Sequence, residues 1–511
     1  MILAQTSPEP GSIEMPHVDW GGLSPLLFLA GGALVILIVT ALGVRRPPRH
    51  TWCFLTVATG LGTLVAAIVQ WNRVDDDGAY GIVANALVVD GFSVFVTALI
   101  AVAVVLAALL ADGYLRRERL DGPELYVLML LSATGGVMMA MANDLVVLFL
   151  GLEVLSIALY VLAGYDLRRA ESSEAAIKYF VLGAFSSAFL LYGIALIYGA
   201  TGSTNLGAIA DFLDTNVLTE DGLLLGGFAL LLVGLGFKVA AVPFHVWTPD
   251  VYQGAPSPVT AFMASASKAA GFAALLRVFV STFGLYQDDW RPVVFVLAVL
   301  TLLVGSVLAI VQTDVKRMLA YSSISHAGFV LVGVQAASDR GVSGALFYLL
   351  AYTFMVVGSF GVVTLVGRRG DADHSLEAYR GLATRQPVLA LVFTIFLLAQ
   401  AGVPFTSGFL AKFYVIGAAV DADSYGLAIL AMLAAVIAAY VYLRIVVAMY
   451  MTADEEAEEG APAAREPVRV PPLARLSLGV ALGVTILFGI LPGPAVDWAD
   501  HATTAQIAPD Q

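Results

Sequence analysis

The 511-residue sequence contains a single cysteine, Cys53. One thiol excludes an intrachain disulfide and a cysteine-ligated iron–sulfur cluster, which takes four thiolates. A glycine-rich phosphate loop is also lacking, because Gly234 and Gly236 lie within an apolar run and no third glycine follows in register. The sequence therefore gives no sign of a nucleotide or redox cofactor on this chain.

Charge is scarce as well. Charged residues account for 13% of the sequence and hydrophobic residues for 59%. Since about 20 apolar residues suffice to cross a bilayer, this composition predicts a polytopic membrane protein. The net charge of −13 says little about partners, because much of it lies at 75–77 and 454–459, which we interpret as solvated loops. We expect the lipid bilayer as a partner and no nucleic acid.

The apolar runs predict an all-α membrane protein. The first 23 residues contain neither Lys nor Arg, so we interpret the first run as a retained helix rather than a cleaved signal. Runs of about 20 residues predict about fourteen spans: 24–44, 51–71, 91–111, 124–142, 144–164, 175–199, 223–252, 258–282, 292–311, 317–337, 341–367, 386–420, 425–450 and 474–493. The seventh and twelfth are long and interrupted by Pro and Gly, which is typical of discontinuous helices.

Short matches indicate an internal repeat of about five spans. Because five is odd, the second copy must enter the membrane upside down, which is the inverted-repeat plan of transporters with ion sites between broken helices. We therefore predict helices 1–3 in 1–123, five-helix repeats in 124–282 and 292–450, a disordered cytoplasmic loop at 451–473 and a final helix and tail in 474–511. The matches are AVPF at 241–244 with GVPF at 402–405, VLAG at 161–164 with VLVG at 330–333, and Tyr179 with Tyr348.

Arginine is crowded into alternate loops. Cytoplasmic loops carry the excess of Lys and Arg, so this bias predicts that these loops are cytoplasmic and that both termini lie on the outer side. The residues concerned are Arg45, Arg46, Arg49, Arg116, Arg117, Arg119, Arg168, Arg169, Lys316, Arg317, Arg368, Arg369, Arg380, Arg385, Arg465, Arg469 and Arg475.

Lysine has nearly the opposite distribution. Only five lysines exist, and all but Lys316 fall within apolar spans. Lys238, Lys268 and Lys412 lie near the middle of theirs, as does Glu153, the only acidic residue deep in a span. Arginine cannot lose its proton in a protein, whereas a buried lysine changes its pKa readily. The pattern therefore predicts a path for protons.

Two further groups suit that path. A Lys–Glu pair about 4 Å apart is worth on the order of 4 kcal/mol at an effective dielectric of about 20, so moving Glu153 relative to a lysine would capture or release a proton. The neutral imidazoles of His245 and His326 can both donate and accept, which suits a relay. Haem ligation by these histidines has no other support in the sequence.

Each group also has a simpler interpretation. Lys178 lies about one turn inside its span, and its ammonium either takes part in the relay or reaches back to the surface. Arg277 and Arg444 are expected to reach the surface in the same way. A buried Lys–Glu pair could be a structural staple. The carboxylates near span ends are expected to be solvated helix caps: Asp90, Asp112, Asp144 and Asp250.

Three motifs resemble a known family. They are PFHVWTPDVYQGAPSPVTAF at 243–262, MLAYSSISHAG at 318–328 and GFLAKFY at 408–414. With the fourteen expected spans, they make the chain similar to the antiporter-like subunits of the proton-pumping NADH:quinone oxidoreductase (respiratory complex I), and to its subunit N in particular. Phe405 departs from the pattern, since many relatives have Pro there.

The resemblance implies roles for the buried charges. Glu153 would pair with Lys238, Lys268 would be the central relay, and Lys412 would lead to the outside, with Lys178, His245 and His326 as secondary relay candidates. NADH, FMN, the iron–sulfur clusters and quinone would be bound by other subunits, with subunits K and M as neighbours in a bacterial inner membrane. The alternative is a subunit of a multisubunit sodium/proton antiporter, which shares the fold.

Overall fold

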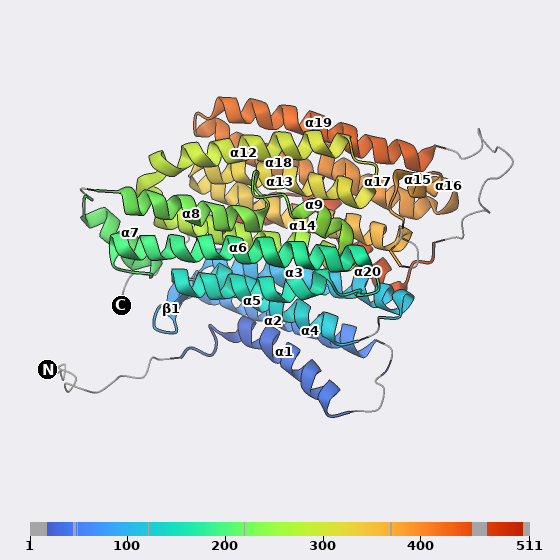
Figure 1. The fold of residues 1–511 in the computed structure, drawn as a ribbon, viewed down its shortest axis with the longest axis horizontal. Helices are drawn as coiled ribbons and strands as arrows, with labels where there is room; N and C mark the ends of the chain where they lie inside the picture. Colours follow the sequence, from blue (N-terminus) through green and yellow to red (C-terminus); the bar gives the residue numbers. More distant parts are fainter. Residues whose placement is uncertain are drawn as a thin grey trace.

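A computed structural model describes residues 18–43, 48, 50–120, 122–218, 220–367, 370–371, 373–451 and 468–503. Its long helices lie side by side with nearly parallel axes (Figure 1). Within the described residues, thirteen helices are long and apolar enough to cross a membrane. The interrupted pair α17 (Pro387–Ala401) and α18 (Ser407–Asp421) adds a further crossing. The all-α fold with about fourteen spans is thus confirmed.

The first half of the chain contains a short hairpin among its helices. Strands β1 and β2 pair antiparallel, with Tyr80 opposite Val89. The elements are α1 (Ser24–Ala41), α2 (Thr51–Asp77), β1 (Tyr80–Ile82), β2 (Leu87–Val89), α3 (Gly91–Glu118), α4 (Glu124–Met141), α5 (Leu145–Ala163), α6 (Ala170–Thr201), α7 (Leu206–Thr215), α8 (Gly222–Val239) and α9 (Thr248–Gly254).

A composite helix follows, in which α-helical and π-helical turns alternate without interruption: α10 (Ser257–Phe262), η1 (Met263–Ser267), α11 (Lys268–Leu275) and η2 (Leu276–Thr282). We refer to it as the composite helix (Ser257–Thr282). The remaining elements are η3 (Gly284–Tyr286), α12 (Gln287–Ile310), α13 (Val315–Ala336), α14 (Asp339–Val366), α15 (Leu376–Tyr379), α16 (Leu382–Arg385), α17, α18, α19 (Tyr425–Tyr450), α20 (Pro472–Ile490) and α21 (Gly493–Ala502).

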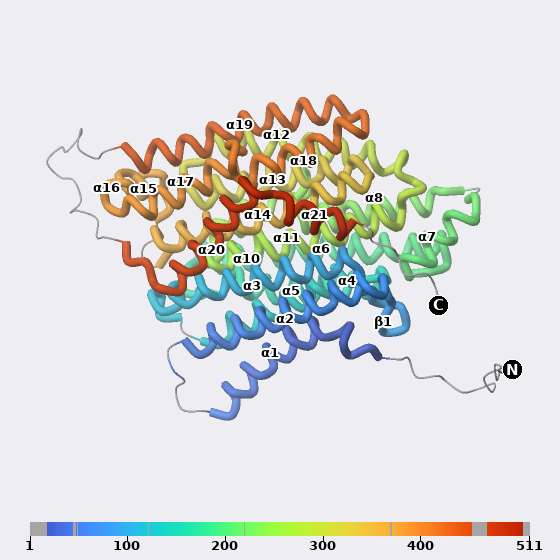
Figure 2. Tube along the Cα trace, turned by 180° about the vertical axis from the view of Figure 1, so that it is seen from behind, coloured from blue at the N-terminus to red at the C-terminus, as the bar shows by residue number. Residues whose placement is uncertain are grey.

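Four helices form the centre of the bundle. The apolar windows of the composite helix, α13 and α14 are wholly buried, and that of α3 is 89% buried, compared with 22% for α1. In the view from behind, α20 runs across the bundle alongside α3 and α14 (Figure 2). Polar groups on the central helices are therefore surrounded by protein, where buried ionisable side chains must find partners.

The two expected helix breaks are present. Helix α8 ends at Val239 and α9 begins at Thr248, while α17 ends at Ala401 and α18 begins at Ser407. Ala240 and Gly402 have positive φ angles of 63° and 93° where the helices stop. A left-handed residue is a common way to end a helix. Proline at 243 and 404 then prevents the helix from resuming at once.

Equivalent contacts recur in the two halves. Isolated backbone bridges join Asp144 to Asn205 and Asp314 to Ser375, and both aspartates cap the helix that follows them, α5 and α13. Gly135 lies against the backbone of Leu155 in the first half, and Gly305 against that of Ser325 in the second. The same interval along the chain separates all four pairs of equivalent positions. These contacts support the internal repeat expected from the sequence.

Two amphipathic helices were not predicted. In α7, Leu206, Ile209 and Leu213 are buried along one face, and α21 buries Ala495, Ala499 and Ala502. Both are too short to span a bilayer, and so a search for runs of about 20 apolar residues misses them. Most of the predicted disordered loop at 451–473 lies outside the described residues.

Several expectations about charged side chains were wrong. Arg277 does not reach the surface: it is 1% exposed and forms two hydrogen bonds of 3.0 Å with the carboxylate of Asp90. Asp90 is fully buried and caps α3, so it is not solvated, and Asp112 is 4% exposed inside α3, so it is not a solvated cap either. Lys316, expected in a cytoplasmic loop, is fully buried in the first turn of α13 and pairs with Asp371. Such pairs join residues far apart in the sequence, which composition cannot match.

Candidate functional site

Lys238 lies in the last turn of α8, immediately before the first helix break. Side chains satisfy backbone groups that the break leaves free: the indole of Trp247 donates to the carbonyl of Phe237 at 3.1 Å, and the amide of Val242 donates to the hydroxyl of Thr301 at 2.9 Å. The carbonyls at a helix C-terminus favour a cation. The break therefore provides a rigid and electrostatically suitable position for the Lys238 ammonium.

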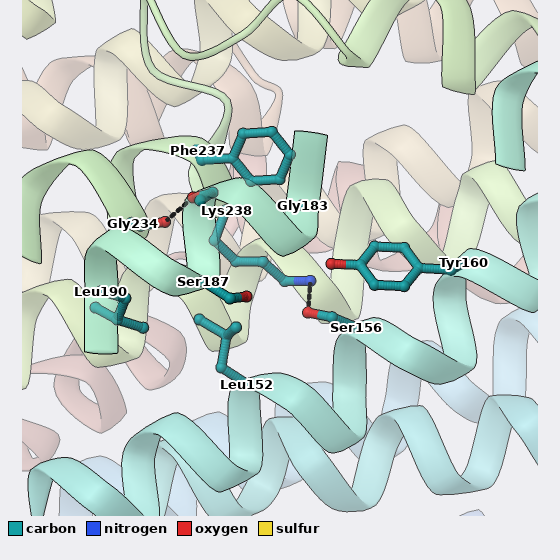
Figure 3. Close-up of a pocket in the computed structure, with 10 residues that line it drawn as sticks. Leu152, Ser156, Tyr160, Gly183, Ser187, Leu190, Gly234, Phe237 and Lys238 are labelled. Atoms are coloured by element: carbon teal, nitrogen blue, oxygen red, sulfur yellow. Dashed lines mark hydrogen bonds between the residues drawn. The ribbon is translucent and has the colours of Figure 1, made fainter. Parts of the chain in front are cut away.

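The Lys238 ammonium points into a small cavity between α5, α6 and α8 (Figure 3). Its Nζ donates to the hydroxyl of Ser156 at 2.9 Å and to that of Tyr179 at 3.4 Å. Ser187 and Tyr160 also line the cavity. Hydroxyl groups can both donate and accept, so these neighbours can solvate either protonation state of the lysine.

Glu153 lies on α5 about one turn before Ser156. Among the described residues, Glu153 and Lys238 form no ion pair within 4.0 Å, so the direct pairing implied by the resemblance is absent from this structure. The two residues are still close enough to interact electrostatically. The Oε1 atom of Glu153 is buried and has no hydrogen-bond partner in the part of the chain that the structure describes. Glu153 therefore carries a free acceptor on the same helix as Ser156, the partner of Lys238 in this structure.

Lys268 occupies the centre of the composite helix. It follows the π-helical turn η1, and π-helical turns inside α-helices are frequent at functional sites. Its Nζ donates to the carbonyl of Ser323 at 2.6 Å and to the hydroxyl of the same residue at 2.5 Å, and it lies 5.7 Å from the ring centroid of Tyr352. Lys268 is 3% exposed. It thus connects the two halves of the molecule, since Ser323 belongs to α13.

Lys412 lies at the second break. It belongs to α18, and its Nζ donates to the carbonyls of Gln400 and Ala401 at 2.8 Å each. These carbonyls lie at the end of α17 and accept no hydrogen bond from a later helical amide. They are therefore free to bind a cation. The packing at Gly402 is close, because a Cβ there would lie 3.1 Å from Cδ of Lys412. The broken helix therefore forms the lysine site directly.

Hydroxyl and imidazole groups link α13 to the Lys412 site. The ring nitrogens of His326 lie 2.6 Å from the hydroxyl of Tyr348 and 3.1 Å from that of Tyr442. The Tyr442 hydroxyl also bonds that of Ser322, which donates to the side-chain carbonyl of Gln400 at 3.3 Å. Gln400 is the residue whose backbone carbonyl holds Lys412. His326 thus joins the polar network of the second half.

The two remaining candidates lie apart from this network. His245 is half-buried in the first break, and its Nδ1 has no hydrogen-bond partner among the described residues. Lys178 is 40% exposed and pairs with Asp250 at 2.5 Å and Glu174 at 2.6 Å. Arg317 donates to the other oxygen of Asp250 at 2.6 Å. Lys178 is therefore neither a free surface lysine nor a direct contact of Lys238, and Asp250 is a bridging carboxylate rather than a simple cap.

Comparison with known proteins identifies the family. Residues 142–438 match the family described as "NADH:quinone oxidoreductase/Mrp antiporter, TM". The sequence is 43% identical over 481 residues to NADH-quinone oxidoreductase subunit N of Trichlorobacter lovleyi, covering 94% of this chain and 96% of the relative. The chain belongs to the subunit N family.

Solved structures agree with this assignment. A chain of respiratory complex I from Thermus thermophilus with bound aureothin superposes with a TM-score of 0.76 at 33% sequence identity, covering 93% of this chain and 98% of that one. A chain of the Mrp complex from Dietzia sp. gives a TM-score of 0.81 at 23% identity, covering 96% and 98%. At that identity the second match shows a shared fold alone. The family range includes all four principal candidates: Glu153, Lys238, Lys268 and Lys412.

In this member of the subunit N family, no metal-binding cluster is evident in the described part of the chain: no three residues of the types His, Cys, Asp and Glu are grouped there. The site is instead a set of buried lysines, each held by hydroxyl groups or by backbone carbonyls. The sequence indicated the lysines. It gave no indication that Ser156, Ser323 and the end of α17 would be their partners.

Proposed function

We propose that this chain is a proton-translocating membrane subunit of NADH:quinone oxidoreductase. The observation that carries the proposal is the contact of Lys268, a buried lysine in the centre of the bundle, with Ser323 of the opposite repeat. A proton carrier needs a side chain that can hold and release a proton at mid-membrane, and lysine can do so while arginine cannot. NADH oxidation and quinone reduction take place on other subunits, which bind FMN, the iron–sulfur clusters and quinone.

The proposed route runs from Lys238 through Lys268 to Lys412. Lys238 and Lys412 each lie at a broken helix, and Lys268 lies between them. On the side of Lys412, the hydroxyls of Ser322 and Tyr442 and the ring of His326 offer groups that both donate and accept. Water would complete the steps between them, since ordered water bridges buried polar groups that lack a protein partner. His245 and Lys178 are secondary members of the relay.

Glu153 would control the first step. The Lys238 ammonium is carried on a flexible four-carbon stem, and Ser156 and Glu153 lie about one turn apart on the same face of α5. The side chain can therefore move between the hydroxyl and the carboxylate with little movement of the backbone. Pairing with Glu153 would stabilise the protonated lysine, and return to Ser156 would favour proton release towards Lys268. A charge change in a neighbouring subunit would drive this movement.

The remaining expectations concern the setting of the chain. We propose that it lies in a bacterial inner membrane between subunits K and M, with both termini on the outer side. The proposed working units are the five-helix repeats at 124–282 and 292–450. The orientation rests on the arginines gathered at one end of the bundle, the end at which α3 finishes and α13 begins, since basic loops stay on the cytoplasmic side. We call this the arginine-rich end; it includes Arg116, Arg168, Arg317, Arg385 and Arg475.

Two variants of Lys268 test the proposal in the intact enzyme reconstituted in vesicles. Lys268→Met removes the carrier, and Lys268→Arg keeps the charge but cannot release a proton. We expect both to assemble and to translocate fewer protons per NADH oxidised than the wild type. A normal ratio in Lys268→Arg would mean that the site needs only a fixed charge, and the relay would then be wrong.

The alternative is a subunit of a sodium/proton antiporter, favoured only by the fold shared with the Mrp complex. Sodium dependence separates the two functions. The enzyme proposed here pumps protons equally well with and without sodium, whereas an antiporter subunit would exchange sodium against a pH gradient in the absence of NADH.

A further inference from the structure

A fully buried ionic cluster lies at the arginine-rich end of the bundle, outside the lysine route. Its centre is Asp371, in the segment between α14 and α15, which is 2% exposed. Lys316 donates to the Oδ2 atom of Asp371 at 2.9 Å, and the Nε2 atom of His374 lies 2.8 Å from Oδ1. Arg169, at the start of α6, approaches to 3.5 Å. None of these charges is accounted for by the proton route.

The same cluster holds the junction between α9 and α10. Lys316 donates to the carbonyl of Ala255 at 2.8 Å, and the hydroxyl of Ser257 bonds both carboxylate oxygens of Asp371 at 3.0 and 3.2 Å. This junction has few hydrogen bonds of its own, because Pro256 and Pro258 have no amide proton. Its position therefore depends on the cluster.

The junction leads directly to the central lysine. Ser257 begins the composite helix that carries Lys268, and Lys316 lies in α13, about two turns before Ser323 on the same face. The two helices are therefore joined at two levels: through Asp371 at the arginine-rich end, and through the Lys268–Ser323 contact in the middle of the bundle. A displacement of the contacts made by Asp371 would therefore change the geometry of the Lys268–Ser323 contact.

The segment that carries Asp371 is itself well anchored. The amide of Val315 donates to the carbonyl of His374 at 2.7 Å, and the amide of Leu376 donates to the carbonyl of Thr313 at 2.8 Å. Burial acts to raise the pKa of Asp371, but Lys316 and His374 lower it, and the resulting pKa lies well below the usual value. Asp371 therefore stays ionised at neutral pH and holds its partners in place.

We propose that Asp371 is a positioning residue for Lys268. Together with Lys316, it holds the α9–α10 junction against α13 and so sets the geometry in which Lys268 contacts Ser323. The proposal rests on the proton transfer proposed above. We call the set of Asp371, Lys316 and Ser257 the latch.

Asp371→Asn tests the latch in the intact enzyme. The amide keeps the size of the side chain but leaves Lys316 and Arg169 without a counter-charge. Asp166→Asn is a matched control, because Asp166 is also a buried carboxylate at this end, paired with Arg168, and no hydrogen bond joins it to α10 or α13 among the described residues. Two readouts are needed: protons translocated per NADH oxidised, and hydrogen–deuterium exchange of the segment 252–262.

We expect Asp371→Asn to raise exchange in that segment about tenfold, equivalent to about 1.4 kcal/mol, and to lower the proton ratio of the assembled enzyme. Asp166→Asn should change neither. Unchanged exchange or an unchanged proton ratio in Asp371→Asn overturns the latch, and so does an equal effect of Asp166→Asn. Failure of the proposed proton route is seen separately, as a normal proton ratio in Lys268→Met.

Asp371→Glu decides the question if Asp371→Asn does not assemble. It keeps the charge, so Lys316 and Arg169 retain their partner and the enzyme should assemble, but the longer side chain displaces the contacts with Ser257. A positioning role predicts a reduced proton ratio in this variant. Wild-type values for both the exchange and the proton ratio would show that only the charge is required, and the latch would be wrong.

Discussion

The ammonium of Lys238 donates to the hydroxyl of Ser156 at 2.9 Å, and Glu153, whose Oε1 atom has no partner among the described residues, lies about one helical turn before Ser156 on α5. One flexible cation thus faces a helix that carries two acceptors of different strength. A hydrogen bond between a neutral acceptor and a charged donor is worth about 1.5–3 kcal/mol, which is of the same order as the value of about 4 kcal/mol for a Lys–Glu pair at an effective dielectric of about 20. A small change in the local potential can therefore decide between the two positions.

Ser156→Ala should move Lys238 to Glu153. Removal of the hydroxyl takes away the contact that competes with the carboxylate and leaves the cavity otherwise intact. We expect a structure of the variant enzyme to show Nζ of Lys238 within about 4 Å of the Glu153 carboxylate, the usual limit of an ion pair. If the ammonium keeps its wild-type position against Tyr179, the two-position switch is wrong.

Glu153→Gln should separate function from stability. Because Glu153 forms no ion pair among the described residues and its Oε1 atom has no hydrogen-bond partner there, the neutral isostere should assemble with a yield close to that of the wild type. The proton ratio should fall, since Lys238 loses its second position. The comparison needs the yield of assembled enzyme together with protons translocated per NADH. A normal yield with a normal ratio would contradict the role of Glu153.

Much of the site could be predicted from residue type and position. The prolines at 243 and 404 fixed the two breaks, since neither can continue a helix, and lysines within apolar runs indicated the buried charges. The direction of each side chain could not be predicted. Lys238 donates to Ser156 rather than to Glu153. A long side chain has several possible partners within one helical turn, and sequence spacing does not predict which of them it contacts.

The buried ion pairs were missed for a different reason. Asp90 and Arg277 looked like surface groups because each lies near the end of its span. They meet only when α3 packs against the composite helix. There the guanidinium and the carboxylate form a bidentate pair, with two hydrogen bonds that satisfy both charges. Pairing between distant segments is a property of the packed bundle, so a single sequence does not reveal it.

The Asp90–Arg277 pair is expected to be structural. Removing one member of a buried pair leaves the other without a counter-charge and costs about 3–5 kcal/mol. We expect Asp90→Asn to lower the amount of assembled enzyme, while the molecules that do assemble keep their proton ratio. The double variant Asp90→Asn/Arg277→Met should recover much of the yield, because no buried charge remains. An Asp90→Asn enzyme with a normal yield would show that the pair contributes little.

Acid should weaken the latch. The pKa of Asp371 in the folded enzyme lies below the usual value of 3.8, so its carboxylate contributes stability above that value and loses the contribution as the pH falls through the depressed value. The wild type should therefore have a higher thermal midpoint than Asp371→Asn at neutral pH, and the difference should narrow below about pH 4. A difference that widens as the pH falls would have the wrong sign for an ionised Asp371.

Tyr442→Phe should interrupt the network that leads to Lys412. The Tyr442 hydroxyl contacts both Ser322 and His326, and phenylalanine keeps the ring packing while removing that hydroxyl. A group that takes part in proton transfer contributes about 100-fold or more to the step it assists, so we expect proton translocation to slow measurably even where water partly replaces the hydroxyl. Tyr440→Phe is the matched control, because Tyr440 lies on the same helix and is 56% exposed. It should pump like the wild type, and equal pumping by both variants would remove Tyr442 from the route.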